Sequence, residues 1–373
     1  MKYKMGLGVL SVVASMMSAV LAAGALTGSF AQVNPAIPNG AVSGEAVNDA
    51  GQVVGGADFA DGTHGFVRAA DGTYTELAAL PPATSSWASA INNDGDVVGS
   101  SGGAAVRWPG GGAPVDLGAL PGETWSSAVD ISDTGWIVGN GSDTSQAWYI
   151  DPAVGTIAQI TPVAGATITQ VRAVNDDGVA VGRVRVAGVF EPFTWNVVDG
   201  MTLLPEPPGE SGFEPGDVNS SGQIIGDVFH FDPTGSTYSA YLLDPTDGYR
   251  QLSVDGFDSA FPRGMSDAGW VVGWVSNADA DRVPAAWDLT SGDATAFPPF
   301  NGAAFTNELN AVNGAGLAVG ISREGDDFDR TYVGRIGHDP DLPIEPPQTT
   351  TTLAPNSPAR PAVPVAASPT YTG

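Results

Sequence analysis

The chain has 373 residues, of which 14 are basic and 41 acidic, with three histidines, no cysteine and a formal net charge of −27. Phosphate binding requires clustered cations, so the composition argues against nucleic acid or an anionic membrane surface as a partner. The absence of cysteine excludes disulfide bonds and thiolate chemistry. The 50 glycines and 29 prolines indicate many short strands joined by tight turns.

Residues 1–31 have the pattern of an export signal. Both lysines of the chain lie within its first four residues, an apolar run follows over 5–26, and small residues lead up to Ala31. The apolar run is long enough to cross a membrane, so an uncleaved anchor is the alternative. The pattern predicts a secreted protein that begins at Gln32 and has no later membrane span.

Seven copies of one short phrase follow, and they are the strongest pattern in the sequence. The first copy reads Val-Asn-Asp-Ala-Gly-Gln-Val-Val-Gly over 47–55. Its turn glycine recurs at intervals of 40–47 residues, and a second glycine follows four positions later in every copy. The seven turn glycines are Gly51, Gly95, Gly135, Gly178, Gly222, Gly269 and Gly316.

Each phrase has the chemistry of a β-hairpin. A polar residue opens the turn and can hydrogen-bond its backbone, and the glycine supplies a positive φ before a β-branched run. We predict a structural role for the opening residues, which are Asn48, Asn92, Ser132, Asn175, Asn219, Ser266 and Asn313.

A third apolar segment with one aromatic residue follows each hairpin, and a fourth segment, such as 115–120 or 201–204, follows in six copies. Four short strands in about 44 residues are typical of a propeller blade. We expect the aromatic residues to pack between neighbouring blades; they are Phe66, Trp108, Trp148, Trp195, Tyr241, Trp287 and Tyr332. The sequence therefore predicts an all-β, seven-bladed β-propeller with four-stranded blades over 32–338.

The seventh copy ends at 332–336 without a fourth segment, which would leave an unpaired sheet edge. The segment Val33–Pro38 resembles the fourth segment of the second copy and lies before the first copy. We expect this N-terminal strand to pair with the last blade and close the ring, with Pro35 at its exposed edge.

Residues 339–373 are rich in proline, threonine and alanine and cannot build a core. They predict a disordered, extended tail. Such a tail suits a spacer through a cell wall, so association with the wall is a hypothesis.

The copies resemble the HAF-type extracellular repeat of bacteria over about 41–336. The second copy carries the resemblance most fully, through Ser86, Ala88, Ile91, Asn92, Gly95, Val97, Val98 and Gly99, then Asp116, Leu117, Gly118 and Leu120. The His-Ala-Phe element of that family is degraded here, with 64–66 as its nearest match. The resemblance implies an exported, propeller-like repeat protein without an assigned reaction.

No catalytic motif is present, and the histidines at 64, 230 and 338 have no metal-binding spacing. In the expected inner strand, the residue three positions before the turn Asn or Ser varies between copies. We select Glu45, Arg172, Arg263 and Asn310 from these positions as candidate ligand-binding residues at the channel mouth. The alternative is that they are ordinary channel residues.

An acidic loop in the seventh copy is the candidate metal site. Hard cations prefer oxygen ligands from flexible loops, and Asp326, Asp327 and Asp329 offer such ligands to calcium. The alternative is a solvated acidic loop, and the sequence implies no other cofactor.

The leading functional hypothesis is a non-enzymatic binding scaffold, secreted or on the cell surface, for an extracellular ligand such as a glycan or cell-wall component. One alternative is a propeller enzyme, a glycoside hydrolase or lyase, that uses carboxylates near the channel to cleave a polysaccharide. Another is a structural surface-layer component. Paired carboxylates with raised pKa at one mouth would favour the enzyme, and an aromatic or loop-rich face would favour binding.

Overall fold

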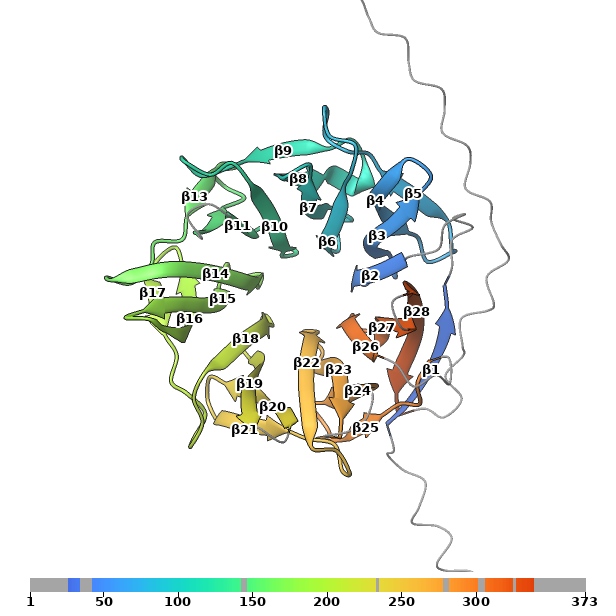
Figure 1. Ribbon diagram of the computed structural model, residues 1–373, viewed down its shortest axis with the longest axis vertical. Coiled ribbons are helices and arrows are strands. Elements are labelled where there is room, and N and C mark those ends of the chain that lie inside the picture. The colour runs from blue at the N-terminus through green and yellow to red at the C-terminus, as the bar shows by residue number, and fades with distance from the viewer. Residues whose placement is uncertain are drawn as a thin grey trace, which may run out of the picture.

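The computed structural model describes residues 26–33, 42–141, 146–232, 235–277, 282–300, 306–324 and 327–338. These residues form 28 β-strands in seven four-stranded antiparallel sheets, arranged around a central channel (Figure 1). The predicted all-β, seven-bladed propeller is thus confirmed. Within these ranges no helix is long and apolar enough to cross a membrane.

Each of blades 1 to 6 takes its strands from one continuous stretch, with the first strand innermost. Blade 1 contains β2 Val42–Val47, β3 Val53–Phe59, β4 Gly62–Arg68 and β5 Tyr74–Leu77. Blade 2 contains β6 Trp87–Ile91, β7 Val97–Ser101, β8 Ala104–Trp108 and β9 Val115–Gly118, with the short 3-10 helix η1 Pro109–Gly111 between the last two. Blade 3 contains β10 Ser126–Ile131, β11 Ile137–Gly141, β12 Ala147–Ile150 and β13 Ile157–Gln159.

The second half of the ring repeats this order. Blade 4 contains β14 Ala166–Val174, β15 Ala180–Val186, β16 Val189–Asn196 and β17 Gly200–Leu203. Blade 5 contains β18 Phe213–Val218, β19 Ile224–Asp232, β20 Gly235–Asp244 and β21 Gly248–Leu252. Blade 6 contains β22 Ser259–Met265, β23 Trp270–Ser276, β24 Val283–Asp288 and β25 Ala294–Ala296. Blade 7 contains β26 Thr306–Val312, β27 Leu317–Glu324, β28 Asp327–Gly337 and, from the other end of the chain, β1 Thr27–Gln32.

The N-terminal strand closes the ring, but the strand lies earlier in the chain than Val33–Pro38. All six residues of β1 pair with β28, from Thr27 opposite Gly337 to Gln32 opposite Tyr332. Only Val33 of the expected segment is described; it extends the pairing through its N–H to the Thr331 carbonyl (2.9 Å) and is buried. Two prolines in 34–38 lack the N–H that pairing uses, whereas every residue of β1 has one.

An aromatic side chain anchors this strand. The Phe30 ring lies 5.3 Å from the Phe297 ring and 5.1 Å from the Phe300 ring, measured between centroids. Leu26, just before the strand, is buried in the same cluster of blades 6 and 7. The closing strand is therefore held by side-chain packing as well as by its backbone pairing.

The repeated turns have the predicted hairpin geometry. The seven turn glycines have φ values between 73° and 92°, and each donates its N–H to the carbonyl of the turn-opening residue at 2.9–3.1 Å. Opening asparagines also donate a hydrogen bond to a neighbouring blade. Asn48 accepts the N–H of Gln52 within its own turn (2.9 Å) and donates to the Asn92 carbonyl of the next blade (3.0 Å). Asn313 donates in the same way to the Asn48 carbonyl (2.9 Å), across the point of closure.

We expect Asn48→Ala to lower the free energy of unfolding by about 1–3 kcal/mol, because it removes the acceptor of the Gln52 N–H and the hydrogen bond to the Asn92 carbonyl of the next blade, which keeps only the Gly95 N–H. Asn48 is buried. Asp94→Ala, at an exposed position of the neighbouring turn, should change it by less than about 0.5 kcal/mol. Chemical denaturation of the two variants measures the difference, and equal midpoints would contradict the structural role.

The second glycine of every copy lies under a backbone carbonyl. A Cβ at this glycine would stand 1.8–2.3 Å from a carbonyl oxygen of the inner strand, that of the residue just before its pairing partner, in all seven blades. Real Cβ atoms do not approach an oxygen this closely, so glycine is required. The glycines are Gly55, Gly99, Gly139, Gly182, Gly226, Gly273 and Gly320.

The predicted packing role of the seven aromatic residues also holds, since all are at most 8% exposed. Trp108 on blade 2 illustrates the arrangement: it is fully buried among Val54, Val67 and Leu77 of blade 1. Its indole N–H donates to the Ala78 carbonyl (2.9 Å). The core is thus a series of apolar layers between blades, which leaves the channel polar.

Candidate functional site

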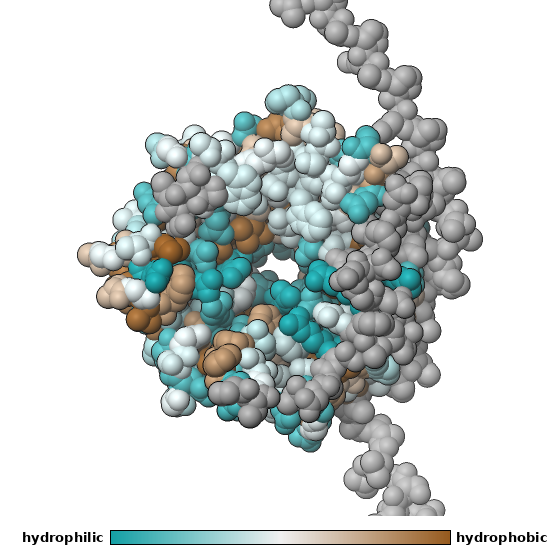
Figure 2. Space-filling model, in the orientation of Figure 1, coloured by the Kyte–Doolittle hydropathy of each residue, from teal (hydrophilic) through white to brown (hydrophobic). Residues whose placement is uncertain are grey.

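The variable position of the inner strand is a β-bulge in every blade. The register between the first and second strands skips one residue, so that this residue has no partner across the ladder. A bulge redirects the side chain it carries. The seven bulge residues all line a central cavity of about 330 Å³; they are Glu45, Ser89, Val129, Arg172, Gly216, Arg263 and Asn310. Figure 2 shows hydrophilic residues around the channel opening.

The ring therefore brings together the four candidate ligand-binding residues. Asn310 donates to the Gly44 carbonyl (2.8 Å) and so fastens blade 7 to blade 1. Glu45 accepts a hydrogen bond from Ser43 (2.7 Å). Arg263 forms an ion pair with Glu308 (3.2 Å). Arg172 lines the cavity and has no hydrogen bond or ion pair to any other residue that the structure describes.

The three candidate calcium ligands cannot be placed in the same way. Asp326 lies outside the described residues, and Asp327 and Asp329 belong to β28 with side chains that are not described. The described ranges contain no group of three or more His, Asp or Glu side chains suited to a metal ion.

One mouth of the channel is formed by the repeated turns, and its carboxylates hold neighbouring blades together. In five of the seven turns, the side chain of the residue after the opening Asn or Ser accepts a backbone N–H from the preceding blade. Asp133 accepts from Asn93 (2.7 Å), Asp176 from Asp133 (2.8 Å), and Asp49 from Gly314 (3.0 Å) across the closure. These carboxylates have structural partners, and they make this mouth acidic.

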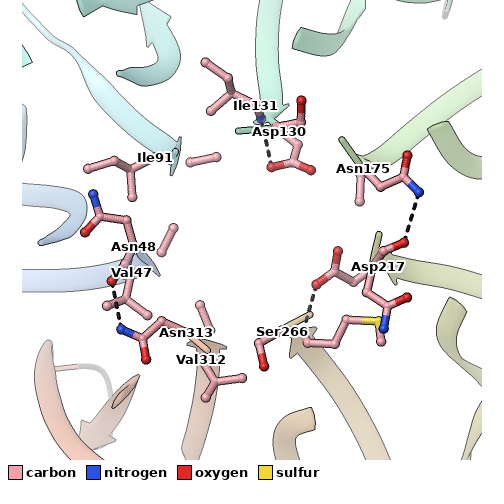
Figure 3. Close-up of a pocket in the computed structure, with 18 of the residues that line it drawn as sticks. Val47, Asn48, Ile91, Asp130, Ile131, Asn175, Asp217, Ser266, Val312 and Asn313 are labelled. Atoms are coloured by element: carbon pink, nitrogen blue, oxygen red, sulfur yellow. Dashed lines mark hydrogen bonds between the residues drawn. The ribbon is translucent and has the colours of Figure 1, made fainter. Parts of the chain in front are cut away.

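Two further carboxyl groups lie inside the channel and point into it (Figure 3). Asp130 accepts the N–H groups of Ile131 (2.8 Å) and of Val174 in the next blade (2.9 Å). Asp217 does the same between blades 5 and 6. Burial raises the pKa of Asp130 to about 6 and that of Asp217 to about 7, where the Asp130 charge adds to the effect. Both groups connect neighbouring blades.

The opposite side of the blades carries residues that the sequence analysis missed. The position directly after the second glycine varies between copies as much as the bulge does; its residues are Gly56, Ser100, Asn140, Arg183, Asp227, Trp274 and Ile321. It lies on the second strand, opposite the residue two positions before the bulge, as in the pair Glu214 and Asp227. A comparison of the copies at this second variable position would have identified Arg183 and Asp227 from the sequence.

Blades 4 to 7 gather charged residues at this level. Arg183 contacts the Glu214 carboxylate of the next blade. Glu308 is buried and lies 3.2 Å from Arg263 and 3.5 Å from Arg282. Burial raises the pKa of Asp227 to about 7; the Glu214 charge adds to the shift, and arginines including Arg172 and Arg263 oppose it. The mouth therefore combines cations with a carboxyl group that is half protonated near neutral pH.

An aromatic row leads from the β19–β20 hairpin towards this cluster. Phe229 is 49% exposed, and its ring lies 5.1 Å from that of Tyr238, which in turn lies 5.2 Å from Phe261. Phe261 stacks on Trp274 at 5.3 Å, and the Arg282 guanidinium covers Trp274 at 4.1 Å. We call the charged residues of blades 4 to 7, together with this row, the hairpin mouth.

Fold and channel define the protein as a seven-bladed β-propeller with a polar central channel. No family model matches the chain, and no curated protein matches it in sequence. The HAF-type resemblance therefore rests on the repeated phrase alone.

Solved structures show the same architecture. Virginiamycin B lyase from Staphylococcus aureus matches with a TM-score of 0.55 and 13% identity, over 83% of this chain and 99% of that one. A streptogramin B lyase matches with a TM-score of 0.54 and 10% identity, over 83% and 98%. An oligogalacturonate lyase in complex with manganese matches with 0.53 and 12%, over 85% and 99%. At these identities the likeness shows the propeller fold alone.

Proposed function

We propose that the protein is exported and acts outside the cell as a binding protein, with the central channel at its bulge residues, next to the hairpin mouth, as its ligand site. The observation that carries the proposal is the convergence of variable, charged bulge residues on one channel within an otherwise uniform repeat. Repeated structural positions keep one residue type, whereas binding uses positions that differ between blades. Exposed Phe229 and Phe231 beside the mouth support an interaction surface.

Export requires a cleavage that leaves β1 intact. Cleavage after Ala31 would remove five of the six residues of the closing strand. We therefore place the boundary before Leu26, where Ala23 and Ala25 supply the small residues that signal cleavage prefers. Amino-terminal sequencing of the exported protein tests this boundary.

A channel-blocking variant tests the binding function. The Cβ of a residue at Gly216 would have its nearest neighbour at 3.7 Å, so Gly216→Phe fits the bulge and fills the cavity that Gly216 lines. In a glycan and cell-wall-fragment array, with and without calcium, we expect the unmodified protein to bind and Gly216→Phe to lose roughly tenfold or more in affinity.

The matched control is Val198→Phe, which adds an aromatic ring at an 86% exposed position on the outside of blade 4. It should bind as the unmodified protein does. Binding that survives Gly216→Phe, or no binding to any array component, would refute the proposed site.

A second candidate function is cleavage of an extracellular polysaccharide. Its supporting observation is Asp227, a carboxyl group with a pKa raised to about 7 beside Glu214, since a general acid or base works best near the ambient pH. Release of new chain ends from a bound polysaccharide, abolished in Asp227→Asn, would support catalysis. Binding without any product would leave the scaffold function.

A further inference from the structure

A second cavity lies outside the channel, between blades 2 and 3 (Figure 1). Its volume is about 460 Å³, larger than the 330 Å³ of the channel cavity. This volume lies within the range of small-molecule sites, roughly 300–1,000 Å³. The second cavity is lined by residues of the repeated turns and of the connections between third and fourth strands. Among the described lining residues the two cavities share only Asp133, so the second cavity is a separate place for a ligand.

Two local features of blade 2 shape this cavity. The connection from β8 to β9 contains η1, the one helical turn within the described residues, and its Pro109 lines the cavity. The ladder between β8 and β9 skips Leu117, and a bulge redirects the side chain that it carries. Leu117 lines the cavity and packs against the core cluster that contains Ile137 and Ile150. The Asp-Leu-Gly element at 116–118, part of the repeat resemblance, therefore forms one wall.

Part of the cavity wall is apolar. Ile137 and Ile150 of blade 3 are buried, and Leu117 of blade 2 is half-buried. Val115, which also lines the cavity, is 48% exposed. Such a wall is stabilised when an apolar group covers it and displaces water. A hydrated metal ion would gain nothing from this wall, so the cavity favours a ligand with an apolar body.

The polar part of the wall is acidic. The lining carboxylates are Asp94, Asp96, Asp116 and Asp133. Arg107 is the one cation among the described lining residues, and it already contacts Asp96. The Asp94 side chain is exposed and has no hydrogen bond or ion pair with any other described residue. Asp116 accepts the Gly118 N–H with one oxygen (2.8 Å), which leaves its other oxygen for a ligand. Opposite charges attract, so these carboxylates favour a cation over a neutral or anionic ligand.

We propose that this cavity binds an organic cation with an apolar body, such as an arylalkylammonium. The ammonium group contacts the carboxylates of Asp94 and Asp116, and the apolar body covers Val115 and Leu117. Solvent-exposed ion pairs alone contribute little to affinity, and an apolar wall alone does not select for charge. The combination selects one chemical class. The inference goes beyond the proposed function, because the cavity is separate from the channel.

Calorimetric titrations of the protein with four small probes test this assignment. Phenethylammonium carries both features, phenethyl alcohol lacks the charge, methylammonium lacks the ring, and hydrocinnamate reverses the charge. At about pH 7 and low salt we expect phenethylammonium to bind roughly tenfold or more tightly than each of the other three. Its affinity should fall severalfold at about 0.5 M salt, because salt screens the attraction to the carboxylates.

Two substitutions remove charge with little change of shape. Asp116→Asn keeps an oxygen that can accept the Gly118 N–H, and Asp94→Asn loses no hydrogen bond with another described residue. The double variant should bind phenethylammonium about tenfold more weakly and no better than phenethyl alcohol. Val115→Thr, a polar side chain of similar shape, should weaken the binding of phenethylammonium about threefold.

Asp247→Asn is the matched control. It removes an exposed carboxylate from the β20–β21 turn, the corresponding connection of blade 5, and should bind phenethylammonium normally. Equal binding of phenethyl alcohol would overturn the cationic assignment. Methylammonium or calcium binding as tightly as phenethylammonium would overturn the role of the apolar wall.

No saturation by phenethylammonium up to about 10 mM, or an equal loss of affinity in Asp247→Asn, would refute the site. The array measurement with Gly216→Phe concerns the channel alone. The proposed function and this inference can therefore fail separately.

Discussion

A variant that begins at Gln32 should unfold roughly 6 °C or more below a variant that begins at Leu26, a loss of about 4 kcal/mol or more. The shorter variant lacks five of the six residues of β1 and therefore most of the pairing with β28. It also loses Phe30, whose ring packs against Phe297 and Phe300, and Leu26 from the same cluster. The exposed edge of β28 would then invite association with other chains.

Thermal unfolding and gel filtration of the two purified variants measure these effects, and neither measurement depends on export. The full chain from Met1, purified in the absence of membranes, is the reference. It shows whether the residues before the strand change the melting temperature. Identical melting temperatures for the Leu26 and Gln32 variants would show that β1 does not close the ring in solution.

The second large effect is expected for Gly182→Ala, which should lower the free energy of unfolding by about 3 kcal/mol or more. The new methyl group would lie 2.0 Å from the Gln170 carbonyl oxygen and 2.9 Å from the Val171 Cα, and both are backbone atoms in a paired strand. These two close contacts can be relieved only if the first two strands of blade 4 separate. That separation would also move the bulge that carries Arg172.

Gly235→Ala is the matched control, because a Cβ there meets no heavy atom within 4 Å and the backbone does not need a positive φ. Its free energy of unfolding should change by less than about 0.5 kcal/mol. Urea denaturation followed by tryptophan fluorescence compares the two. Similar midpoints would refute the steric account of the repeated second glycine.

The fold could be predicted because its determinants are local and are repeated. Each turn needs a positive φ and a side chain that binds its backbone, and seven copies of that demand are visible in the sequence. The closing strand was placed too late because Thr27–Gln32 lies next to the apolar run of the expected signal. Its true partner, β28, can be recognised only when the two ends of the chain are brought together.

The candidate site could be predicted only in part. Variation among copies identified Arg172 and Arg263, since a bulge releases its residue from the ladder and so from the constraint of the repeat. Asp227 was missed because the prediction used variation between copies only on the inner strand, and Asp227 lies on the second strand of its blade, β19. Its raised pKa arises from burial and from Glu214, and the arginines that oppose the shift come from adjacent blades.

Pairing of β1 with β28 also sets an order of events. Thr27 and Gly337 stand 310 residues apart, whereas blade 1 draws all its strands from 42–77. Six blades can assemble from neighbouring residues as the chain emerges, but the first strand waits for the last. In a chain exported amino end first, the seventh blade would form only after every other blade has crossed. The ring can then close only in a molecule whose whole propeller has been exported.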